Sequence, residues 1–439
     1  MNNMKRVLSW RTFSSSFAQR WAAFFSALAL LVIAAAPAES ATCNKKNMHW
    51  VGTWASSPMA PEDSFWGTPN EGFENVTIRQ IAHVSIGGEQ VRIRLSNAFG
   101  AEALTIDAAH VALQKTGESI VPETDRALTF SGESFVTIPA GAVAISDPVD
   151  LTVQPCANLA VSVYVDLPTG PATFHDITHQ SVYISIEGDH TASETLPVGN
   201  VGVSGFWLSG VEVLAPKQAV SVVAFGDSIT EGMSSTIDGN QRWPDHFSAL
   251  LNNCDSKNRN YGRYRYGKVG IVNQGISGNR LLSNLMSKNA LARMDRDVLA
   301  QSGATHVFVL IGINDLGLPV VYGMPELMPT PEDIIAGLKQ LAIRAKAAGL
   351  KVILGTLTPY DGTMGYFSSE GEIARTTVNE WIRSTDVVDA IVDYDAVVRN
   401  PDSPSEMLPE FDSSDHLHPN DAGYQAMAEA AVAVFVRMR

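Results

Sequence analysis

A serine stands where an apolar run gives way to polar, helix-starting residues. The run at 222–225 ends at Gly226, and Asp227 and Ser228 come directly after it. A strand that turns sharply into a helix would place the Ser228 hydroxyl at the carboxyl edge of a sheet, where open α/β sheets bind ligands. A serine there can act as a nucleophile if a base lies within reach. Taken alone, the pattern also fits an ordinary turn in which Asp227 or Ser228 caps a helix.

Two further loops could complete such a site. The apolar run 268–273 leads into a loop with Gly275 and Gly278, whose missing side chains let backbone approach closely and expose N–H groups. The run 306–311 leads into Gly-Ile-Asn-Asp, which places Asn314, with its two amide donors, at the same edge. Alone, these segments would be a flexible loop and a turn.

A histidine near the C-terminus could supply the base. Asp415 precedes His418 by three residues, on a loop just before a helical pattern. The carboxylate can hold one ring nitrogen, which leaves the other free to take a proton. His416 stands too close to Asp415 for this geometry, so we expect it to take no part.

The four blocks Gly-Asp-Ser-Ile, Gly-Ile-Ser-Gly-Asn, Gly-Ile-Asn-Asp and Asp-His-Leu-His-Pro together resemble the SGNH hydrolases, also called GDSL lipases or esterases. They occur in the order seen in the family, and each lies where the strand and helix pattern predicts the end of a strand. The resemblance implies Ser228 as nucleophile, His418 as general base and then acid, and Asp415 as the residue that orients the imidazole. It also implies an oxyanion hole made by the N–H groups of Ser228 and Gly278 and the side-chain amide of Asn314. No metal or organic cofactor is expected.

The elements that would position these residues alternate after residue 215. Strands are predicted at 219–225, 268–273, 306–311, 351–357 and 390–394. Helices are predicted at 243–252, 332–348, 371–384 and 421–438. Strands joined by helical crossovers imply a parallel sheet covered on both faces. We therefore expect an α/β domain, a flavodoxin-like α/β/α arrangement around a five-stranded parallel sheet.

The first half of the chain has a different pattern. Short runs that alternate or are β-branched are separated by Gly, Asn, Asp and Pro, as at 76–84, 90–95 and 159–165. This predicts an all-β, antiparallel sandwich, jelly-roll-like. Blocks at 50–58, 92–100 and 207–211 are similar to secreted bacterial SGNH esterases with an amino-terminal β domain, a subgroup likened to arylesterases and to acetylesterases of glycan breakdown.

Length and charge set the outer limits. A chain of 439 residues is expected to form two domains. Its formal net charge of -15 argues against a nucleic-acid partner. Four basic residues precede the apolar run 21–36, and small residues follow it, as in a secretory signal peptide. The 16-residue run is short for a membrane span.

These observations predict a signal peptide at 1–41, a β-sandwich domain at 42–215 and a hydrolase domain at 216–439. The protein would be exported to the periplasm or beyond the cell, with no stable membrane anchor after cleavage. Its cysteines are Cys43, Cys156 and Cys254, of which one pair could form a disulfide in an oxidising compartment. A Cys43–Cys156 bond would staple the start of the first domain to its later part.

Other polar residues are given lesser roles. His175 and His179 are four residues apart, but the sequence around them is strand and loop, so a structural or substrate-side role is expected rather than metal binding. Asp227 is expected to stabilise the turn before Ser228. Asp238 and Asp315 are interpreted as solvated loop residues.

The segment 359–367 follows the fourth predicted strand and would either wall an acyl pocket or form a loop without a substrate role. The expected activity is hydrolysis of carboxylic esters through an acyl-enzyme. The resemblance implies acetyl or aryl-acyl esters of glycans as the first expected substrates, and small aryl esters as the next. Lipase, lysophospholipase or thioesterase activity is the alternative within the fold. A glycan-binding β module with a dormant hydrolase domain is the alternative of another class. The oligomeric state is not predicted.

Overall fold

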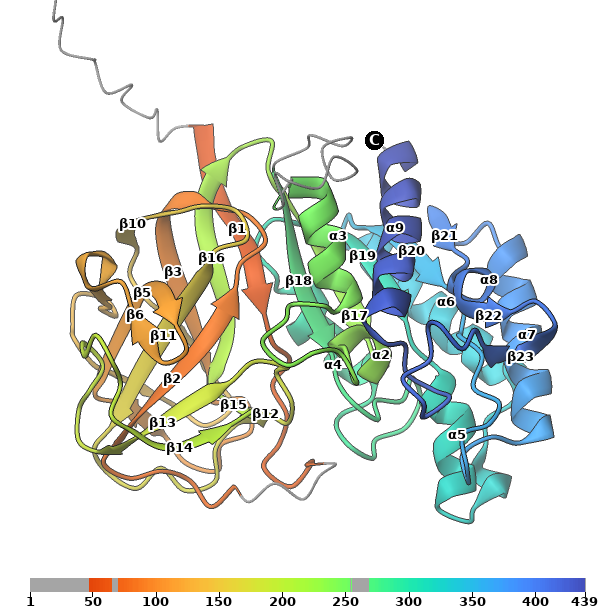
Figure 1. Cartoon of the computed structure of the whole chain (residues 1–439), viewed down its shortest axis with the longest axis horizontal. Coiled ribbons are helices and arrows are strands. Elements are labelled where there is room, and N and C mark those ends of the chain that lie inside the picture. Colours follow the sequence, from red (N-terminus) through yellow and green to blue (C-terminus); the bar gives the residue numbers. More distant parts are fainter. Residues whose placement is uncertain (1–46, 65–69, 253, 255–267, 439) are drawn as a thin grey trace, which may run out of the picture. The chain divides into compact units, whose positions relative to one another are not determined.

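The computed structural model describes residues 47–64, 70–252, 254 and 268–438. The predicted signal peptide and Cys43 lie outside the described residues. From Met48 onward the chain packs as one unit. Its first half consists of strands, and its second half alternates strands with helices (Figure 1).

Two antiparallel sheets face each other in the first half. One has the order β1-β16-β3-β10, with β9 also paired to β3, and the other has the order β14-β13-β2-β11-β5-β6, with β7 paired to β5. The strands of the first sheet are β1 (Met48–Ala55), β3 (Gly88–Ser96), β9 (Val143–Ile145), β10 (Val149–Val153) and β16 (Leu208–Pro216). Those of the second are β2 (Val76–His83), β5 (Ala108–Thr116), β6 (Ser119–Ile120), β7 (Arg126–Ala127), β11 (Asn158–Val165), β13 (Val182–Glu187) and β14 (Val198–Gly202).

The apolar faces of these sheets share one core. In β3, Val91, Ile93 and Leu95 are fully buried and alternate with more exposed neighbours, the two-residue period of a strand with one covered face. They join a single cluster with buried residues of the other sheet, such as Ile78 and Val161. The predicted all-β sandwich is confirmed.

Smaller elements complete this half. Two short antiparallel pairs join β4 (Leu104–Ile106) to β8 (Val136–Ile138) and β12 (Phe174–His175) to β15 (Gly205–Phe206). A single 3₁₀ turn, η2 (Pro122–Thr124), lies beside β5.

The second half is built on a parallel sheet with the order β18-β17-β19-β20-β21. Its strands are β17 (Val220–Gly226), β18 (Val269–Gly275), β19 (Ala304–Leu310), β20 (Lys351–Gly355) and β21 (Ala390–Val392). Counted along the chain this is the order 2-1-3-4-5 of flavodoxin-like folds. The predicted five-stranded parallel sheet is confirmed, with each strand within a few residues of its predicted range.

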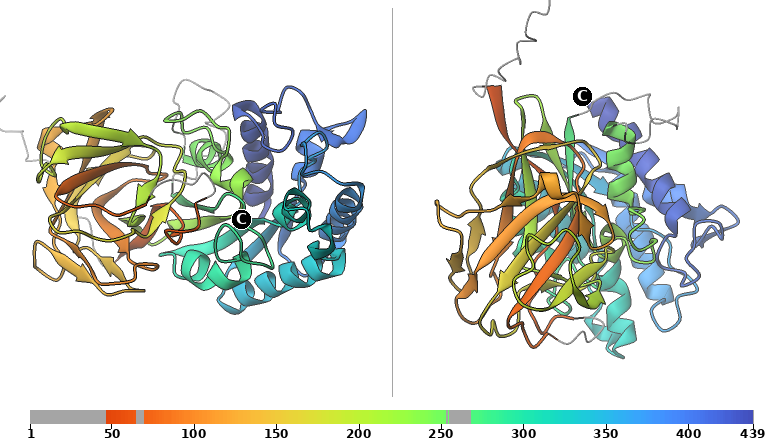
Figure 2. Two further views of the ribbon diagram at one scale, coloured as in Figure 1. Left: turned by 90° about the horizontal axis from the view of Figure 1, so that it is seen from below. Right: turned by 60° about the vertical axis from the view of Figure 1, so that its left-hand side comes forward.

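Helices cover both faces of this sheet (Figure 2). α3 (Trp243–Asn252) and α9 (Asp421–Met438) pack together on one face, while α6 (Pro331–Ala347) and α7 (Ser369–Ser384) pack together on the other. The shorter elements are α2 (Ser228–Glu231), α4 (Ala290–Met294), the π-helix η4 (Asp295–Leu299), α5 (Ile313–Val321), η5 (Pro325–Leu327), α8 (Tyr394–Val398), β22 (Arg399–Asn400) and β23 (Ser403–Met407). All four predicted helices are present.

Local sequence explains where these helices begin and how they pack. Thr330 caps α6 by accepting from the Asp333 N–H, and the Asp333 carboxylate accepts from the Thr330 N–H in return. Under α3 and α9, the ring of Phe247 lies 5.2 Å from that of Phe308 and 5.7 Å from that of Phe435. Such aromatic pairs add to the burial that attaches helices to a sheet. No helix of the described residues is both long enough and apolar enough to cross a membrane.

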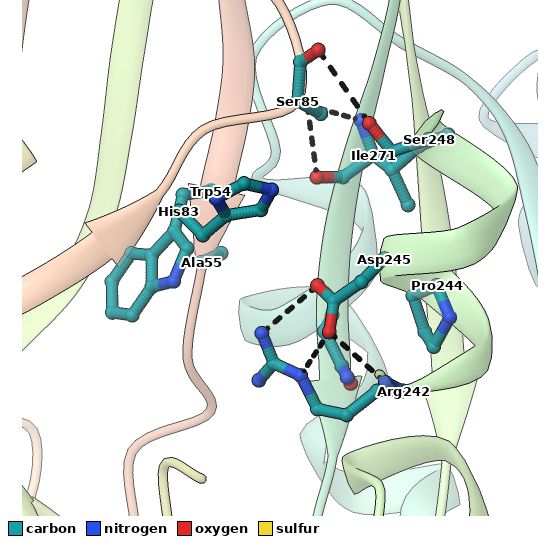
Figure 3. A pocket seen from close by; sticks show the side chains of 10 residues that line it. Trp54, Ala55, His83, Ser85, Arg242, Pro244, Asp245, Ser248 and Ile271 are labelled. Atoms are coloured by element: carbon teal, nitrogen blue, oxygen red, sulfur yellow. Dashed lines mark hydrogen bonds and ion pairs between the residues drawn. The ribbon is translucent and has the colours of Figure 1, made fainter. Parts of the chain in front are cut away.

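The sandwich packs against β18, an edge strand of the parallel sheet, chiefly through β1. Ser85 lies in this contact: its hydroxyl accepts from the Ile271 N–H at 2.7 Å, and its carbonyl accepts from the Asn252 side chain at 3.0 Å. Figure 3 shows the small pocket here, with Trp54 and Ser85 on the sandwich side and the ion-paired Arg242 and Asp245 on the α3 side. Hydrogen bonds between side chains and main chain therefore join the two halves.

A disulfide also crosses between them. Cys156, just before β11, is bonded to Cys254, just beyond α3, with 5.7 Å between the Cα atoms. The Cys43–Cys156 bond, one pairing that the sequence left open, is therefore excluded, because Cys156 is bonded to Cys254. Spacing along the chain could not reveal this pairing, since it depends on how the sandwich lies against α3.

Candidate active site

The nucleophile region follows β17. Asp227 caps α2 by accepting from the Ile229 N–H at 3.0 Å, and α2 begins at Ser228. This is the turn-stabilising role predicted for Asp227. Its second carboxylate oxygen is buried without a hydrogen-bond partner among the described residues. Burial is the main reason that the pKa of Asp227 rises to about 7, so the carboxyl holds its proton far more tightly than usual.

Ser228, His418 and Asp415 form a continuous chain of hydrogen bonds. Ser228 Oγ lies 2.8 Å from His418 Nε2, and His418 Nδ1 lies 2.6 Å from Asp415 Oδ2. The other Asp415 oxygen accepts the N–H groups of Leu417 and His418 at 2.9 and 2.8 Å. The structure thus brings Ser228 to His418, although the two residues are 190 positions apart in the sequence.

The charge on Asp415 fixes the tautomer of the histidine. Partial burial would raise the pKa of Asp415, but the hydrogen bond and charge of His418 and the two backbone donors outweigh it and hold the pKa well below its usual range. An ionised carboxylate can only accept, so His418 Nδ1 must carry a proton. In the neutral ring Nε2 is then the acceptor and can take the proton of Ser228.

His416 is turned to a different carboxylate. Its Nδ1 lies 2.6 Å from Asp412 Oδ2, and half of its side chain is exposed. The sequence-based expectation that it stands outside the Ser228 chain agrees with this placement.

The loop after β18 lies beside the serine. Ile276 donates its N–H to the Gly226 carbonyl at 3.2 Å, and the Ser277 hydroxyl is hydrogen-bonded to the Glu231 carboxylate. Gly278 follows with a φ of 69°, a left-handed conformation that favours glycine. Among the described residues, no acceptor pairs with the N–H of Gly278 or Ser228.

Asn314 joins this loop from the neighbouring strand end. It lies in the first turn of α5 and donates a side-chain N–H to the Asn279 carbonyl at 3.1 Å. The structure therefore places the predicted third oxyanion donor against the residue that follows Gly278. Main-chain and side-chain donors at such a site stabilise the negative oxygen that forms when a carbonyl is attacked.

Asp315 differs from its sequence-based interpretation. It is fully buried, and its carboxylate accepts the N–H groups of Leu281 and Leu282 at 2.6 and 3.0 Å. Burial outweighs these bonds and raises its pKa to about 6. Asp315 thus anchors the loop that carries Gly278, whereas Asp238 is exposed as predicted and accepts from Ser181 at the surface.

A buried ion pair supports α2 from the sandwich. His175 Nε2 lies 3.1 Å from Glu231 Oε1, and His175 Nδ1 lies 2.9 Å from the Ser57 carbonyl. Burial would lower the pKa of His175, but the hydrogen bond and charge of Glu231 outweigh it and the pKa is raised. Burial would raise the pKa of Glu231, but His175 and Ser277 overcome it and the pKa is lowered. The opposite shifts favour the charged form of both partners.

A buried arginine, Arg293, links the ends of two strands beneath the site. Arg293 donates to the Gly226 carbonyl at 2.7 Å, the Gln274 carbonyl at 2.9 Å and the Ser57 hydroxyl at 3.1 Å. Its charge is balanced by Asp297 at 3.0 Å. One guanidinium therefore ties the ends of β17 and β18 to the sandwich.

Sequence reasoning gave no role to Glu231 or Arg293, and it left His175 with either a structural or a substrate-side role. Glu231 could have been suspected, because it lies one helical turn after Ser228. His175 belongs to another sheet, and no spacing rule links it to α2. It has the structural role offered for it as one possibility. Among the described residues, no group of three His, Cys, Asp or Glu side chains is arranged to hold a metal ion.

Comparison with known proteins matches most of the second half of the chain to a family. Residues 222–431 match the family model described as GDSL-like lipase/acylhydrolase. The chain therefore carries a domain of the GDSL, or SGNH, hydrolases. The protein is a carboxylic ester hydrolase by class. A comparison with curated proteins finds no match.

Solved structures with a similar fold cover about half of the chain. One is the native aryl esterase of M. smegmatis, with 17% identity over 50% of this chain and 99% of that chain, at a TM-score of 0.38. Another is a carbohydrate acetylesterase from Sinorhizobium meliloti, with 17% identity over 49% of this chain and 97% of that chain, at a TM-score of 0.36. A third is a GDSL-like lipase from Bacteroides thetaiotaomicron, with 20% identity over 48% of this chain and 85% of that chain, at a TM-score of 0.34.

Proposed function

We propose that the protein is an exported serine esterase in which Ser228 forms an acyl-enzyme. The observation that carries the proposal is the unbroken chain from Ser228 through His418 to Asp415, with Asn314 and the Gly278 loop beside it. A nucleophile, an oriented base and preorganised donors are the parts that acyl transfer requires.

The chemistry follows from these positions. Ser228 Oγ attacks the ester carbonyl carbon as its proton passes to His418 Nε2, and the carbonyl oxygen becomes an oxyanion. The N–H groups of Ser228 and Gly278 and the Asn314 amide stabilise that oxyanion. The C–O bond to the alcohol breaks, and the alcohol leaves with the proton from His418. Water then attacks the acyl-enzyme, gives a proton to His418, and releases the acid and Ser228.

As substrates we propose acetyl or aryl-acyl esters of glycans, or small aryl esters. Their support is the resemblance of the sandwich blocks to esterases of this kind, together with the position of the site. His418 and Asp415 lie on a loop at the rim of the sheet, and the Asp415 side chain is 43% exposed. A site built from loops at a rim is accessible to a bulky, hydrated alcohol such as a sugar.

Export is part of the proposal. The first 41 residues have the charge and apolar pattern of a signal peptide. The Cys156–Cys254 disulfide is consistent with an oxidising compartment, where such bonds persist.

Hydrolysis of lipid esters is the second candidate, and a specific surface favours it. Apolar side chains are exposed along α5 and its continuation, namely Val321, Tyr322, Met324 and Leu327. Met364, on the loop whose Thr363 donates to the His416 carbonyl, is 98% exposed. Grouped exposed apolar residues can contact a lipid surface or a long acyl chain.

The test is a series of p-nitrophenyl esters from acetyl to palmitoyl, with acetylated xylan alongside, assayed with the mature protein. We expect the highest kcat/KM for acetyl or short acyl groups. A maximum at long chains would favour the lipid candidate. Ser228→Ala should lower kcat by at least 10⁴-fold, because the nucleophile is lost.

The neighbouring histidines provide a matched control. His418→Ala should lower kcat about as much as Ser228→Ala, because both belong to one chain of proton transfer. His416→Ala removes an equally carboxylate-bound ring two positions away and should change kcat less than threefold. If the wild type is as inactive as Ser228→Ala toward every ester while it still binds glycans, the hydrolase domain is dormant and the esterase proposal is wrong.

A further inference from the structure

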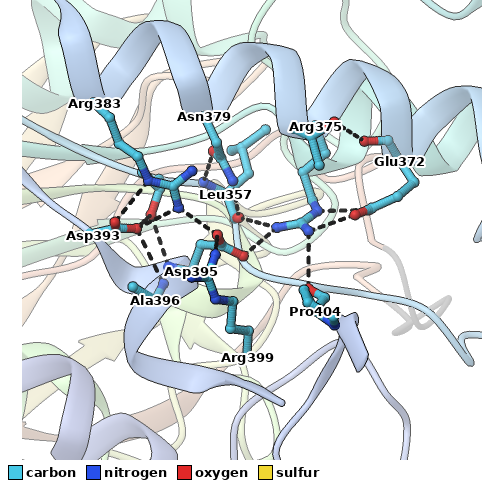
Figure 4. Close-up of polar contacts among 12 residues, drawn as sticks. Leu357, Glu372, Arg375, Asn379, Arg383, Asp393, Asp395, Ala396, Arg399 and Pro404 are labelled. Atoms are coloured by element: carbon cyan, nitrogen blue, oxygen red, sulfur yellow. Dashed lines mark hydrogen bonds and ion pairs between the residues drawn. The ribbon is translucent and has the colours of Figure 1, made fainter. Parts of the chain in front are cut away.

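The segment after β20 is held firmly where it leaves the sheet. Leu357 exchanges two hydrogen bonds with the Asn379 side chain, at 2.7 and 2.8 Å, and its carbonyl also accepts from Arg375 at 2.9 Å (Figure 4). Arg375 in turn contacts Asp395 at 2.6 Å and Glu372 at 2.7 Å. The loop that follows, residues 359–367, therefore begins next to a main-chain segment that hydrogen bonds hold in place.

This loop returns to the active site and ends in a buried tyrosine. The Tyr366 side chain lies against α5, where Gly317 leaves the space for it, since a Cβ atom at Gly317 would overlap the ring. The Tyr366 hydroxyl donates to Asn314 Oδ1 at 3.0 Å. Burial raises the pKa of Tyr366 well above its ordinary value, so the hydroxyl keeps its proton.

The hydrogen bonds of Asn314 determine which way its amide faces. The Asn279 carbonyl can only accept, so the Asn314 atom that contacts it at 3.1 Å must be the amide nitrogen. The amide oxygen then faces Tyr366, which must donate to it. One N–H of the Asn314 amide donates to the Asn279 carbonyl, and the amide oxygen accepts from Tyr366. The second N–H of the amide is then left to donate to an oxyanion.

We propose that Tyr366 is a positioning residue that locks the Asn314 amide with its free N–H toward the oxyanion. The inference rests on the proposed function and deepens it, because it assigns a role to a loop outside the four family blocks. The same loop is tied to the base loop, since Thr363 Oγ1 donates to the His416 carbonyl at 3.0 Å. Residues 359–367 thus contact both the oxyanion donor and the segment that carries His418.

The test compares Tyr366→Phe with Tyr360→Phe on p-nitrophenyl acetate. Tyr366→Phe removes one oxygen and keeps the ring, so we expect kcat to fall about tenfold with KM within twofold, since only transition-state binding is weakened. Binding of an alkylboronic acid, which forms a tetrahedral adduct with a serine, should weaken by a similar factor. Tyr360 is the matched control: its ring lies 5.8 Å from that of Tyr366, and among the described residues its hydroxyl makes no hydrogen bond to Asn314. Tyr360→Phe should leave kcat within twofold of wild type.

A double-mutant cycle separates positioning from a general structural effect. Asn314→Ala should lower kcat about 100-fold, because an oxyanion donor is lost. Adding Tyr366→Phe to Asn314→Ala should then cost nothing more, since Tyr366 acts only through that amide. A further tenfold loss in the double variant, or a wild-type kcat for Tyr366→Phe, would overturn the inference.

Two safeguards keep the outcome decisive. If Tyr366→Phe does not fold by circular dichroism, Thr363→Val loosens the same loop from its surface side, and its loss of kcat should likewise vanish in the Asn314→Ala background. A loss that persists there would show that the loop acts on the base instead, and the inference would be wrong. If Ser228→Ala is as active as wild type, the proposed function itself fails, which is a different result from a fully active Tyr366→Phe beside an inactive Ser228→Ala.

Discussion

Three aspartates around the site show how burial and partners divide one side-chain type into different roles. Asp415 is half exposed and faces His418, and its pKa is held well below its usual range. Asp227 and Asp315 are fully buried, and burial raises their pKa values to about 7 and about 6, although Arg280 lies 3.9 Å from Asp315. The first carboxyl therefore supplies charge to the base, while the other two hold backbone in place.

Asp227 gives a prediction for stability against pH. Its pKa is 3.8 ordinarily and about 7 in the fold, so the folded state binds its proton more tightly than the unfolded state does. Its contribution to the free energy of unfolding is therefore full below about pH 4 and is lost as the pH rises to about 7. Asp227→Asn keeps an oxygen for the Ile229 N–H and cannot ionise. Relative to wild type, the variant should gain stability between pH 4 and 7, by an amount on the order of 4 kcal/mol at most.

Urea unfolding at several pH values measures this difference. Asp238→Asn, an exposed aspartate, is the control and should show no such trend. A constant difference between Asp227→Asn and wild type across this range would mean that Asp227 is ionised in the fold.

At the scale of elements, the nucleophile depends on how closely β18 passes α2. A Cβ atom at Gly275 would overlap the Glu231 main-chain nitrogen and come within 2.8 Å of the Asp227 carbonyl oxygen. Gly275→Ala should thus push α2 away from the Gly278 loop. We expect the free energy of unfolding to fall by about 1–3 kcal/mol, as in overpacked cores, and kcat to fall more than tenfold.

Gly202→Ala is the comparison for that change. Gly202 ends the exposed strand β14, and a Cβ atom there would meet nothing within 4 Å. It should alter neither thermal unfolding nor kcat measurably. Equal kcat for Gly275→Ala and wild type would show that α2 does not depend on this close contact.

The elements were easier to predict from the sequence than the contacts between them. The strands at 219–225 and 306–311 and the helix at 421–438 show up as apolar runs and periodic patterns, which depend only on neighbouring residues. The chain Ser228–His418–Asp415 could be anticipated because its members lie in motifs that together resemble those of the SGNH hydrolases. The burial of Asp315 could not, since it depends on where the backbone of Leu281 comes to lie.

At the scale of the whole molecule, the sandwich is a structural part of the site. His175 supports Glu231 one turn after Ser228, and Ser57 accepts from Arg293 beneath the ends of β17 and β18. Neither contact could be predicted from the sequence, because each joins segments of separate sheets. The His175–Glu231 contact is a buried ion pair, so removing His175 leaves the Glu231 charge without its ion-pair partner.

His175→Ala should therefore affect both stability and catalysis. Loss of one member of a buried ion pair costs about 3–5 kcal/mol, and we expect the free energy of unfolding to fall by that amount. A tilted α2 would also lower kcat, by about tenfold. The pair is weakened at both pH extremes: the contribution of His175 is lost as pH rises through its raised pKa, and that of Glu231 as pH falls through its lowered pKa.

His110→Ala separates the two effects. His110 also contacts a carboxylate, Asp125 at 2.8 Å, but both residues belong to the sandwich. This variant should lose stability and keep the wild-type kcat. If His175→Ala also keeps the wild-type kcat, the sandwich does not support the nucleophile.

The most direct test of the account is covalent trapping of the nucleophile. Diethyl p-nitrophenyl phosphate should release one equivalent of p-nitrophenolate per protein and leave a diethylphosphoryl group on Ser228, as found by mass spectrometry of the peptide that contains it. His418→Ala should react far more slowly, since the serine then lacks its base. A label on any other residue, or equal labelling of the Ser228→Ala variant, would contradict the claim that Ser228 is the catalytic nucleophile.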